Sequence, residues 1–270
     1  APARNSHTRT KRGQTTGWTA GATRRNIAFL RSVNPDTLHV TEHGELLHGF
    51  AFTLTLRHCP ESSDDWQRVR LNWVHRMRRL GIERMHWVVE WQKRGVPHLH
   101  GCFWSTNPDA GQWAIGHWLA AAAQYEPGPK GQYINPVSDY VGWAKYLAKH
   151  AARGVSHYQR SAESIPQAWK KTGRVWGQLG NWDTEDPDRR SISDRSYYRL
   201  RRAARRWRIA DARGENSPHR IRSARTCLKD GNRPTSELRG ISEWIPRPVA
   251  LTLLHWSESV DDESSSGVEK

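Results

Sequence analysis

Apolar and polar residues alternate in one stretch at the start of the central part of the chain. Residues 48–57 place Phe50, Phe52, Leu54 and Leu56 at every second position, with small or polar residues between most of them. Successive side chains of a strand point to opposite faces, so a two-residue period is typical of a strand with one buried face. The pattern therefore predicts a half-buried strand over residues 48–57.

A helical spacing follows this strand. Within residues 63–80 the apolar side chains recur three or four positions apart, at Trp66, Val69, Trp73, Met77 and Leu80. Asp64 and Asp65 fall in the first turn, where the helix dipole favours acidic side chains, and Gly81 is a common type of residue just after a helix. These features predict a helix over 63–80.

The remaining central segments continue this succession of strands and helices. Two strands are expected at 84–92 and 97–104 around a turn centred on Gly95, then a helix at 110–124, a strand at 132–137 and a helix at 138–152 capped by Ser138 or Asp139. The first six elements match the ferredoxin-like arrangement. The expected fold class is therefore α+β, an antiparallel βαββαβ sheet with helices on one face and a basic helical C-terminal extension.

Basic residues are concentrated in two flanks of the 270-residue chain. In total, 42 Lys and Arg residues stand against 27 Asp and Glu residues, a formal net charge of +15. Residues 1–35 carry seven basic residues and no acidic one, and residues 189–225 carry thirteen arginines against three acidic residues. Such a distribution indicates a polyanionic partner, either nucleic acid or an anionic membrane surface.

Two further features of the composition narrow the choice of partner and compartment. No apolar run approaches the ~18 residues of a membrane-spanning helix, so no membrane is expected and nucleic acid is the partner that the charge favours. The three cysteines cannot form a disulfide framework, which fits the reducing environment of a cytoplasm.

Composition divides the chain into four expected parts. A basic N-terminal arm covers 1–40 and the sheet domain covers 41–185. An Arg-rich, helical DNA-binding extension follows at 186–250. Residues 251–270 are expected to form an acidic, Ser-rich tail without regular structure, because their last part offers no apolar residues for a core.

Candidate metal ligands lie on the two central strands. His98 and His100 are two residues apart, so both imidazoles project from the same face of a strand. If the hairpin folds about Gly95, Glu90 lies opposite His100 and shares that face. Glu90 stands in a strongly apolar run, where a carboxylate without a partner is costly to bury. The three side chains therefore suggest a site for a divalent cation, Mg²⁺ or Mn²⁺.

Two other interpretations of the same residues stay open. Glu90 could instead form an ion pair with Lys93 or Arg94 at the mouth of the hairpin. Cys102 lies on the same face as the histidines, so a His-x-His-x-Cys zinc site is a further alternative.

A second candidate group lies in the helix expected at 138–152. Tyr146 and Lys149 are three residues apart and share a helix face. A phenol is a poor nucleophile at neutral pH, but the neighbouring charges of Lys145 and Lys149 favour the phenolate and would neutralise a phosphate under attack. The ordinary alternative is that Tyr146 packs in the core.

Taken together, the motifs of residues 48–180 resemble those of the HUH endonucleases, specifically the rolling-circle replication initiators of plasmids and single-stranded DNA phages. Phe52–Thr55 resembles the family's first motif, Glu90–His100 the second, and Ala144–Lys149 the third. Gly173–Gly177, with the sequence GRVWG, is similar to a segment common in the phage and plasmid branch.

The resemblance implies a specific activity. The protein would be a site-specific single-strand endonuclease and strand transferase, in which Glu90, His98 and His100 bind the metal, Tyr146 forms a 5′-phosphotyrosine and Lys149 assists. Two-tyrosine members carry a second tyrosine at the position of Gly142, so the resemblance indicates a single-tyrosine enzyme. Tyr140 would point elsewhere on a regular helix.

The resemblance also implies partners. The chain has no GxxxxGK[ST] motif, so a host helicase and host replication machinery are expected in a bacterial or archaeal cytoplasm. Single-stranded origin DNA, with its hairpin or duplex, is the expected ligand. The residues expected to contact it are Arg57, Arg94, Lys145, Arg199, Arg201, Arg202, Arg205 and Arg206.

Three alternatives to this function remain at the level of sequence. A relaxase or transposase of the same superfamily would share the chemistry, although the order of metal motif and tyrosine argues against a relaxase. A non-catalytic DNA- or RNA-binding module would explain the charge and the tryptophans and leave the site residues as coincidence. A zinc hydrolase of small substrates would not explain the basic flanks.

Overall fold

The computed structural model describes residues 15–140, 142–143, 157–186, 188, 190–227 and 245–265. The chain divides into two compact units. The first contains the described residues up to 143 together with 157–184, and the second contains those from 185 onward.

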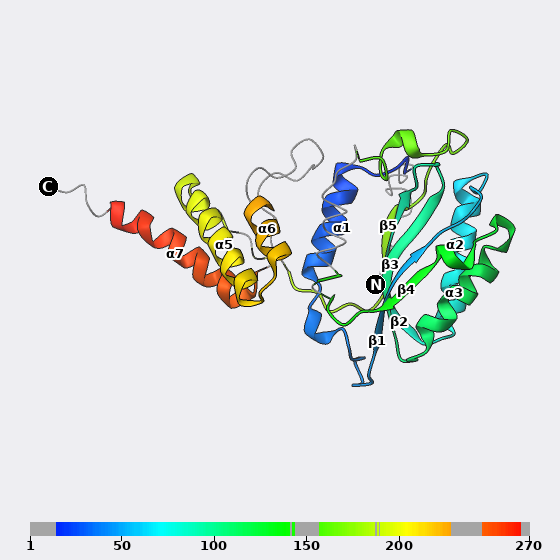
Figure 1. The fold of residues 1–270 in the computed structure, drawn as a ribbon, viewed down its shortest axis with the longest axis horizontal. Coiled ribbons are helices and arrows are strands. Elements are labelled where there is room, and N and C mark those ends of the chain that lie inside the picture. The colour runs from blue at the N-terminus through cyan, green and yellow to red at the C-terminus, as the bar shows by residue number, and fades with distance from the viewer. Residues whose placement is uncertain are drawn as a thin grey trace, which may run out of the picture. The chain divides into compact units, whose positions relative to one another are not determined.

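The first unit is built on a five-stranded sheet in which every neighbouring pair is antiparallel, in the order β4-β1-β3-β2-β5 (Figure 1). The strands are β1 (His48–Leu54), β2 (Ile82–Trp91), β3 (Pro97–Ser105), β4 (Tyr133–Pro136) and β5 (Trp176–Gly180). β3 lies between β1 and β2, and β1 lies between β3 and β4, which is the interleaving of a ferredoxin-like βαββαβ unit. The expected α+β class is confirmed, and β5 adds an edge strand that the sequence pattern did not predict.

One face of the sheet is covered by α2 (Ser63–Arg78) and α3 (Ala110–Ala121), close to the helices expected at 63–80 and 110–124 (Figure 1). A capping box between Ser62 and Asp65 starts α2. The ring of Trp73 lies 5.1 Å from that of Phe52, and its Nε1 donates to the carbonyl of Ala114 at 3.0 Å. Several of the tryptophans are therefore core residues that join these helices to the sheet.

The opposite face of the sheet is covered by α1 (Ala20–Ser32), as Figure 1 shows. Leu30 is fully buried, Asn26 Oδ1 lies 2.7 Å from Nε2 of His86, and the Trp18 indole donates to the carbonyl of Val89. The expectation of a basic arm over 1–40 is therefore wrong from Trp18 onward. The arginines of this segment lie on the exposed side of α1, so a count of charges along the chain does not reveal the apolar side of the helix.

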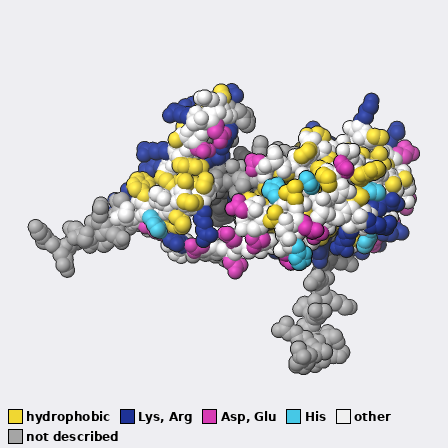
Figure 2. Space-filling view, turned by 90° about the horizontal axis from the view of Figure 1, so that it is seen from below, with side chains coloured by type: hydrophobic (Ala, Val, Ile, Leu, Met, Phe, Trp, Pro, Cys, Tyr) yellow, Lys and Arg dark blue, Asp and Glu magenta, His cyan; other side chains and the backbone are white. Residues whose placement is uncertain are grey.

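Short 3-10 turns complete this unit at Pro35–Thr37, Ala123–Tyr125, Pro129–Gly131 and Ala162–Ser164. In the space-filling view, Lys and Arg side chains gather along one edge of the visible face of this unit and are also frequent on the second unit (Figure 2). No helix within the described ranges has both the length and the apolar character needed to cross a membrane.

The second unit is helical. It contains α5 (Asp194–Gly214), α6 (Pro218–Cys227) and α7 (Arg247–Ser265), and both α6 and α7 pack against α5. The basic helix expected in the extension is present as α5. The expectation of a tail without regular structure over 251–270 is wrong up to Ser265, because α7 extends to that residue. The apolar residues at the start of α7 give it a partner in α5, where Ser196 Oγ donates to the carbonyl of Ser257 and Arg199 lies 5.0 Å from the ring of Trp256.

Candidate metal centre

The hairpin of β2 and β3 brings Glu90, His98 and His100 to one face of the sheet. Glu90 pairs with His98, and Val88 pairs with His100. The expected pairing of Glu90 with His100 is wrong by two residues. The turn is closed by the amide of Gln92 donating to the carbonyl of Val96 at 2.9 Å, so its centre lies one residue earlier than expected. A shift of two residues keeps every side chain on its face, so the cluster forms as expected.

The three side chains are close enough to share one cation. One potential ligand atom from each lies within 4.8 Å of the others. Nε2 of His100 is 3.8 Å from Oε2 of Glu90, and the rings of His98 and His100 are 4.4 Å apart. Glu90 is only 1% exposed, and His98 is also buried. Two imidazoles and one carboxylate at these separations form a donor set that fits a divalent cation.

Thr53 on β1 orients one of these ligands. It pairs directly with His100 in the sheet, and its Oγ1 lies 2.7 Å from Nδ1 of the imidazole. A donation from Nδ1–H to this oxygen leaves the lone pair of Nε2 on the side of Glu90. Burial lowers the pKa of His100, the charge of Glu90 raises it, and Arg160 lowers it. Burial therefore favours the neutral imidazole, the form that binds metals.

Arg160 is a buried partner of Glu90 that no sequence pattern indicated. Its Nε and Nη2 donate to Oε1 of Glu90 at 2.9 and 2.8 Å, and its guanidinium lies 4.1 Å from the ring of Trp18. Arg160 is 2% exposed. It therefore holds one carboxylate oxygen of Glu90 in place, while the other oxygen lies on the side of His100. No local spacing signals this pair, because the two residues are 70 positions apart.

We expect Arg160→Met to lower the free energy of unfolding by about 3–5 kcal/mol, because it leaves the Glu90 carboxylate buried without its counter-charge. Chemical denaturation of the metal-free protein measures the loss. The matched control is the pair Glu90→Gln and Arg160→Met, which removes both charges and should lose clearly less than the sum of the single variants. Additive losses would contradict the ion pair.

The alternatives for this site are not formed in the structure. Among the described residues, the cluster that could hold a metal contains Glu90, His98 and His100 and does not include Cys102. Burial raises the pKa of the Cys102 thiol, which disfavours the thiolate that zinc requires. Glu90 forms its ion pair with Arg160 in place of the expected Lys93 or Arg94.

Two residues expected to contact DNA are Arg57, which follows β1, and Arg94, which lies in the turn between β2 and β3. Arg94 donates to the carbonyls of Leu56 and Arg57 and to Oε1 of Gln92, so it joins the hairpin to the end of β1. Arg57 forms an exposed ion pair with Glu126 at 3.5 Å. Both side chains lie at the edge of the unit and already have protein partners.

The described start of the tyrosine helix lies on the same sheet face as the cluster. Tyr140 is 3% exposed, its hydroxyl donates to the carbonyl of Leu30 at 3.3 Å, and burial raises its pKa. Trp143 lies beside the thiol of Cys102, two residues beyond His100 on β3. Tyr140 is therefore a core residue. The expected site residues Lys145, Tyr146 and Lys149 lie outside the described residues.

Comparison with known proteins identifies relatives along most of the chain. The replication-associated protein G2P of Pseudomonas phage Pf3 is 47% identical over 247 residues, covering 90% of this chain and 86% of the phage protein. The chain belongs to this family of replication-associated proteins. Two Xylella fastidiosa proteins that carry replication-protein names are 44% and 42% identical, and the matches cover 93% and 90% of this chain and 89% and 93% of theirs. No family model and no solved structure matches the chain of this replication protein.

Proposed function

We propose that the protein is a rolling-circle replication initiator of the HUH type, which nicks single-stranded origin DNA through a 5′-phosphotyrosine on Tyr146. The observation that carries the proposal is the buried cluster of Glu90, His98 and His100, with Thr53 and Arg160 already orienting its members. The replication-protein names of the relatives support the biological role.

The described start of the tyrosine helix bears on the choice of nucleophile. Tyr140 is buried, and its hydroxyl donates to the carbonyl of Leu30 on α1. This burial makes Tyr140 unsuited to attack a phosphate and leaves Tyr146, the tyrosine of the third motif, as the proposed nucleophile.

Glu90, His98 and His100 would hold Mg²⁺ or Mn²⁺. When bound, such an ion would act as a Lewis acid that polarises the scissile phosphate. The protein orients the ligands of this ion: Thr53 fixes the ring of His100, and Arg160 fixes the carboxylate of Glu90.

Tyr146 is the proposed nucleophile. Its Oη forms a bond to phosphorus as the bond to the 3′ oxygen breaks; the phenol gives up its proton and the released 3′-OH takes one up. Lys145 and Lys149 favour the phenolate and neutralise charge on the phosphate. The phosphodiester energy is kept in the tyrosyl ester, so the strand can be rejoined without ATP. The free 3′-OH primes synthesis by the host replication machinery, with a host helicase.

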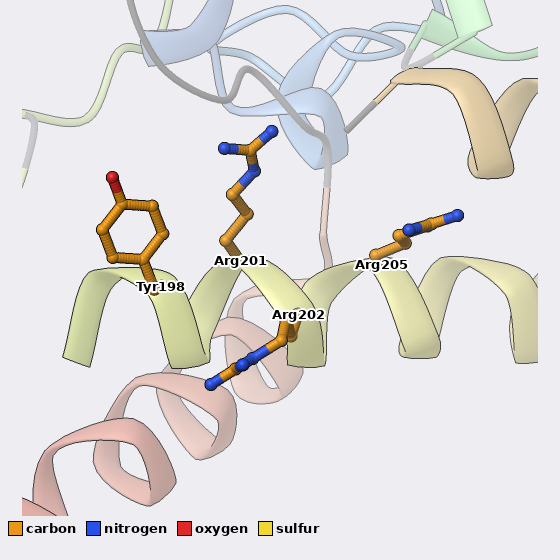
Figure 3. Close-up of a pocket in the computed structure, with 4 residues that line it drawn as sticks. All are labelled: Tyr198, Arg201, Arg202 and Arg205. Carbon is orange, nitrogen blue, oxygen red and sulfur yellow. The ribbon is translucent and has the colours of Figure 1, made fainter. Parts of the chain in front are cut away.

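The basic helix α5 is the proposed contact with origin duplex or hairpin DNA. Tyr198, Arg201, Arg202 and Arg205 line a depression on α5. Tyr198, Arg201 and Arg205 project from one side of the helix, whereas Arg202 points away from them (Figure 3). An exposed aromatic ring beside guanidinium groups suits a nucleic-acid strand, because the arginines contact phosphates and the ring can stack on a base. Arg199 lies against Trp256, and Arg206 is exposed.

We expect the double variant Arg201→Gln and Arg205→Gln to weaken duplex binding and to reduce the slope of log affinity against log salt by about 1.8, since each lost phosphate contact removes about 0.9. Titrations at several salt concentrations measure this slope. Arg213→Gln, a single charge change at the end of α5, is the control. An unchanged slope in the double variant would remove α5 from the interface.

The decisive test of the proposed function is formation of a covalent adduct. The full chain is incubated with Mn²⁺ and single-stranded DNA from the source replicon, then analysed by denaturing gel and intact mass. We expect a protein–DNA adduct that EDTA prevents. If the DNA binds but no adduct forms with either Mn²⁺ or Mg²⁺, the protein is a non-catalytic DNA-binding module.

A further inference from the structure

One arginine outside the metal centre is largely covered by the protein and bonds to no acceptor among the described residues. Arg70 on α2 is 9% exposed, and its guanidinium lies 4.0 Å from the ring of Trp87. The structure shows no hydrogen bond or ion pair from its side chain to any described residue. None of its nitrogens is among the fully buried side-chain atoms without a partner, so the guanidinium lies over the indole while its nitrogens still reach solvent.

A second positive charge acts on Arg70. Burial and the charge of Arg174 lower the pKa of Arg70 to about 10. Residues 171–174 run along α2: Lys171 forms an ion pair with Asp64 at 3.0 Å, and Gly173 lies near Gln67. Asp64 is six residues before Arg70 and is already paired with Lys171. The segment that carries Arg174 therefore follows α2 close to Arg70, and the carboxylate of Asp64 is already engaged by Lys171.

The GRVWG motif builds this arrangement, and the metal centre does not use it. Gly177 on β5 pairs with Trp87 on β2, and a Cβ at Gly177 would lie 2.6 Å from the indole. Glycine therefore lets β5 approach the ring closely, while Arg70 covers it from α2. Arg174 of the same motif is exposed just before β5, at the edge of the sheet. The motif thus contains an exposed arginine, a glycine that lies close to Trp87 and the start of the edge strand β5.

We propose that Arg70 and Arg174 form a binding site for a backbone phosphate of the DNA strand, separate from the metal centre. An anion bound by both side chains offsets the repulsion between the two guanidinium groups and gives Arg70 an acceptor that the described residues do not provide, and guanidinium forks match phosphate oxygens. Arg70 provides a fixed contact, because its plane is stacked on Trp87. This inference rests on the proposed function, because it takes the ligand to be the DNA strand that the initiator binds.

The test compares Arg70→Gln and Arg174→Gln with the control Arg68→Gln, a matched charge change on α2 at a residue that already pairs with Asp65. Binding of single-stranded source-replicon DNA by the full chain is measured in EDTA at several salt concentrations. We expect each of the two variants to bind about tenfold more weakly, with a salt slope smaller by about 0.7. Arg68→Gln should stay within about twofold of the wild type.

Thermal denaturation separates a binding role from a structural one. A phosphate site predicts that Arg70→Gln unfolds at the same or a higher temperature than the wild type, because an unfavourable charge is removed. If Arg70→Gln fails to fold, the exposed Arg174→Gln still decides the question. Wild-type DNA affinity in both variants would overturn the proposal.

Inorganic phosphate distinguishes the source of the anion. If it raises the melting temperature of the wild type and not of Arg70→Gln, while both variants bind DNA normally, the site binds free phosphate and the DNA proposal is wrong. Failure of the wild type itself to bind DNA would instead overturn the proposed function. Because binding is measured in EDTA, the result does not depend on nicking.

Discussion

Tyr146→Phe is expected to abolish the covalent protein–DNA adduct, with a loss of at least about 10³-fold in strand cleavage. The substitution removes only Oη, the atom that would bond to phosphorus, and keeps the ring. No other group in the proposed mechanism forms that bond. The measurement is the amount of adduct on a denaturing gel, confirmed by intact mass, with Mn²⁺ present and DNA from the source replicon.

Tyr140→Phe is the matched control for this prediction. It also removes one phenol oxygen from the same stretch of chain, but this hydroxyl is buried and donates to the carbonyl of Leu30. We expect the adduct to form normally and the stability to fall by about 1 kcal/mol, the usual worth of one hydrogen bond. An adduct that survives Tyr146→Phe and disappears in Tyr140→Phe would transfer the nucleophile to Tyr140.

The second large effect is expected at the metal centre. His98→Ala and His100→Ala should each weaken Mn²⁺ binding by at least about 100-fold, because loss of an outer-shell partner alone costs 10–100-fold. Both variants should also lose adduct formation. Calorimetric titration of the metal-free protein with Mn²⁺ measures the affinity independently of DNA, and dialysis against a chelator should abolish activity until Mn²⁺ or Mg²⁺ is restored.

His86→Gln provides the control for the histidine variants. His86 is also fully buried on β2, but it bonds to Asn26 and lies outside the ligand cluster. Burial lowers its pKa to about 3, so it is neutral at ordinary pH and serves packing. We expect reduced stability with unchanged Mn²⁺ affinity. Equal loss of metal affinity in His86→Gln would show that the effect of the other variants is structural.

Much of the site could be predicted because strand periodicity is local. His98 and His100 share a face whatever the details of the fold, and Glu90 reaches that face in any register that differs by two residues. The exact pairing of Glu90 could not be predicted, because it depends on how the turn at 92–96 closes. The strands β1, β2 and β3 and the helices α2 and α3 were predictable for the same reason, since their patterns extend over many residues.

Other parts of the structure depend on contacts between distant segments. Arg160 lies in an irregular segment, and only the folded chain brings it to Glu90. The helix α1 was hidden by its exposed arginines, and β5 by its short length and its glycines. The helical structure of α7 was not expected, because its acidic end gives no indication that the helix packs against α5, where Ser196 donates to the carbonyl of Ser257.

The ion pair of Arg160 and Glu90 determines how much charge a filled site would carry. The guanidinium offsets the charge of the carboxylate, and a histidine binds a metal ion as the neutral imidazole. A divalent ion at this position would therefore keep its full double charge and present it to a phosphodiester that carries one negative charge. The same balance weakens the hold of the protein on the ion. Such a centre is suited to a loosely held, exchangeable cation whose tightest complex forms only when the nucleic acid is in place.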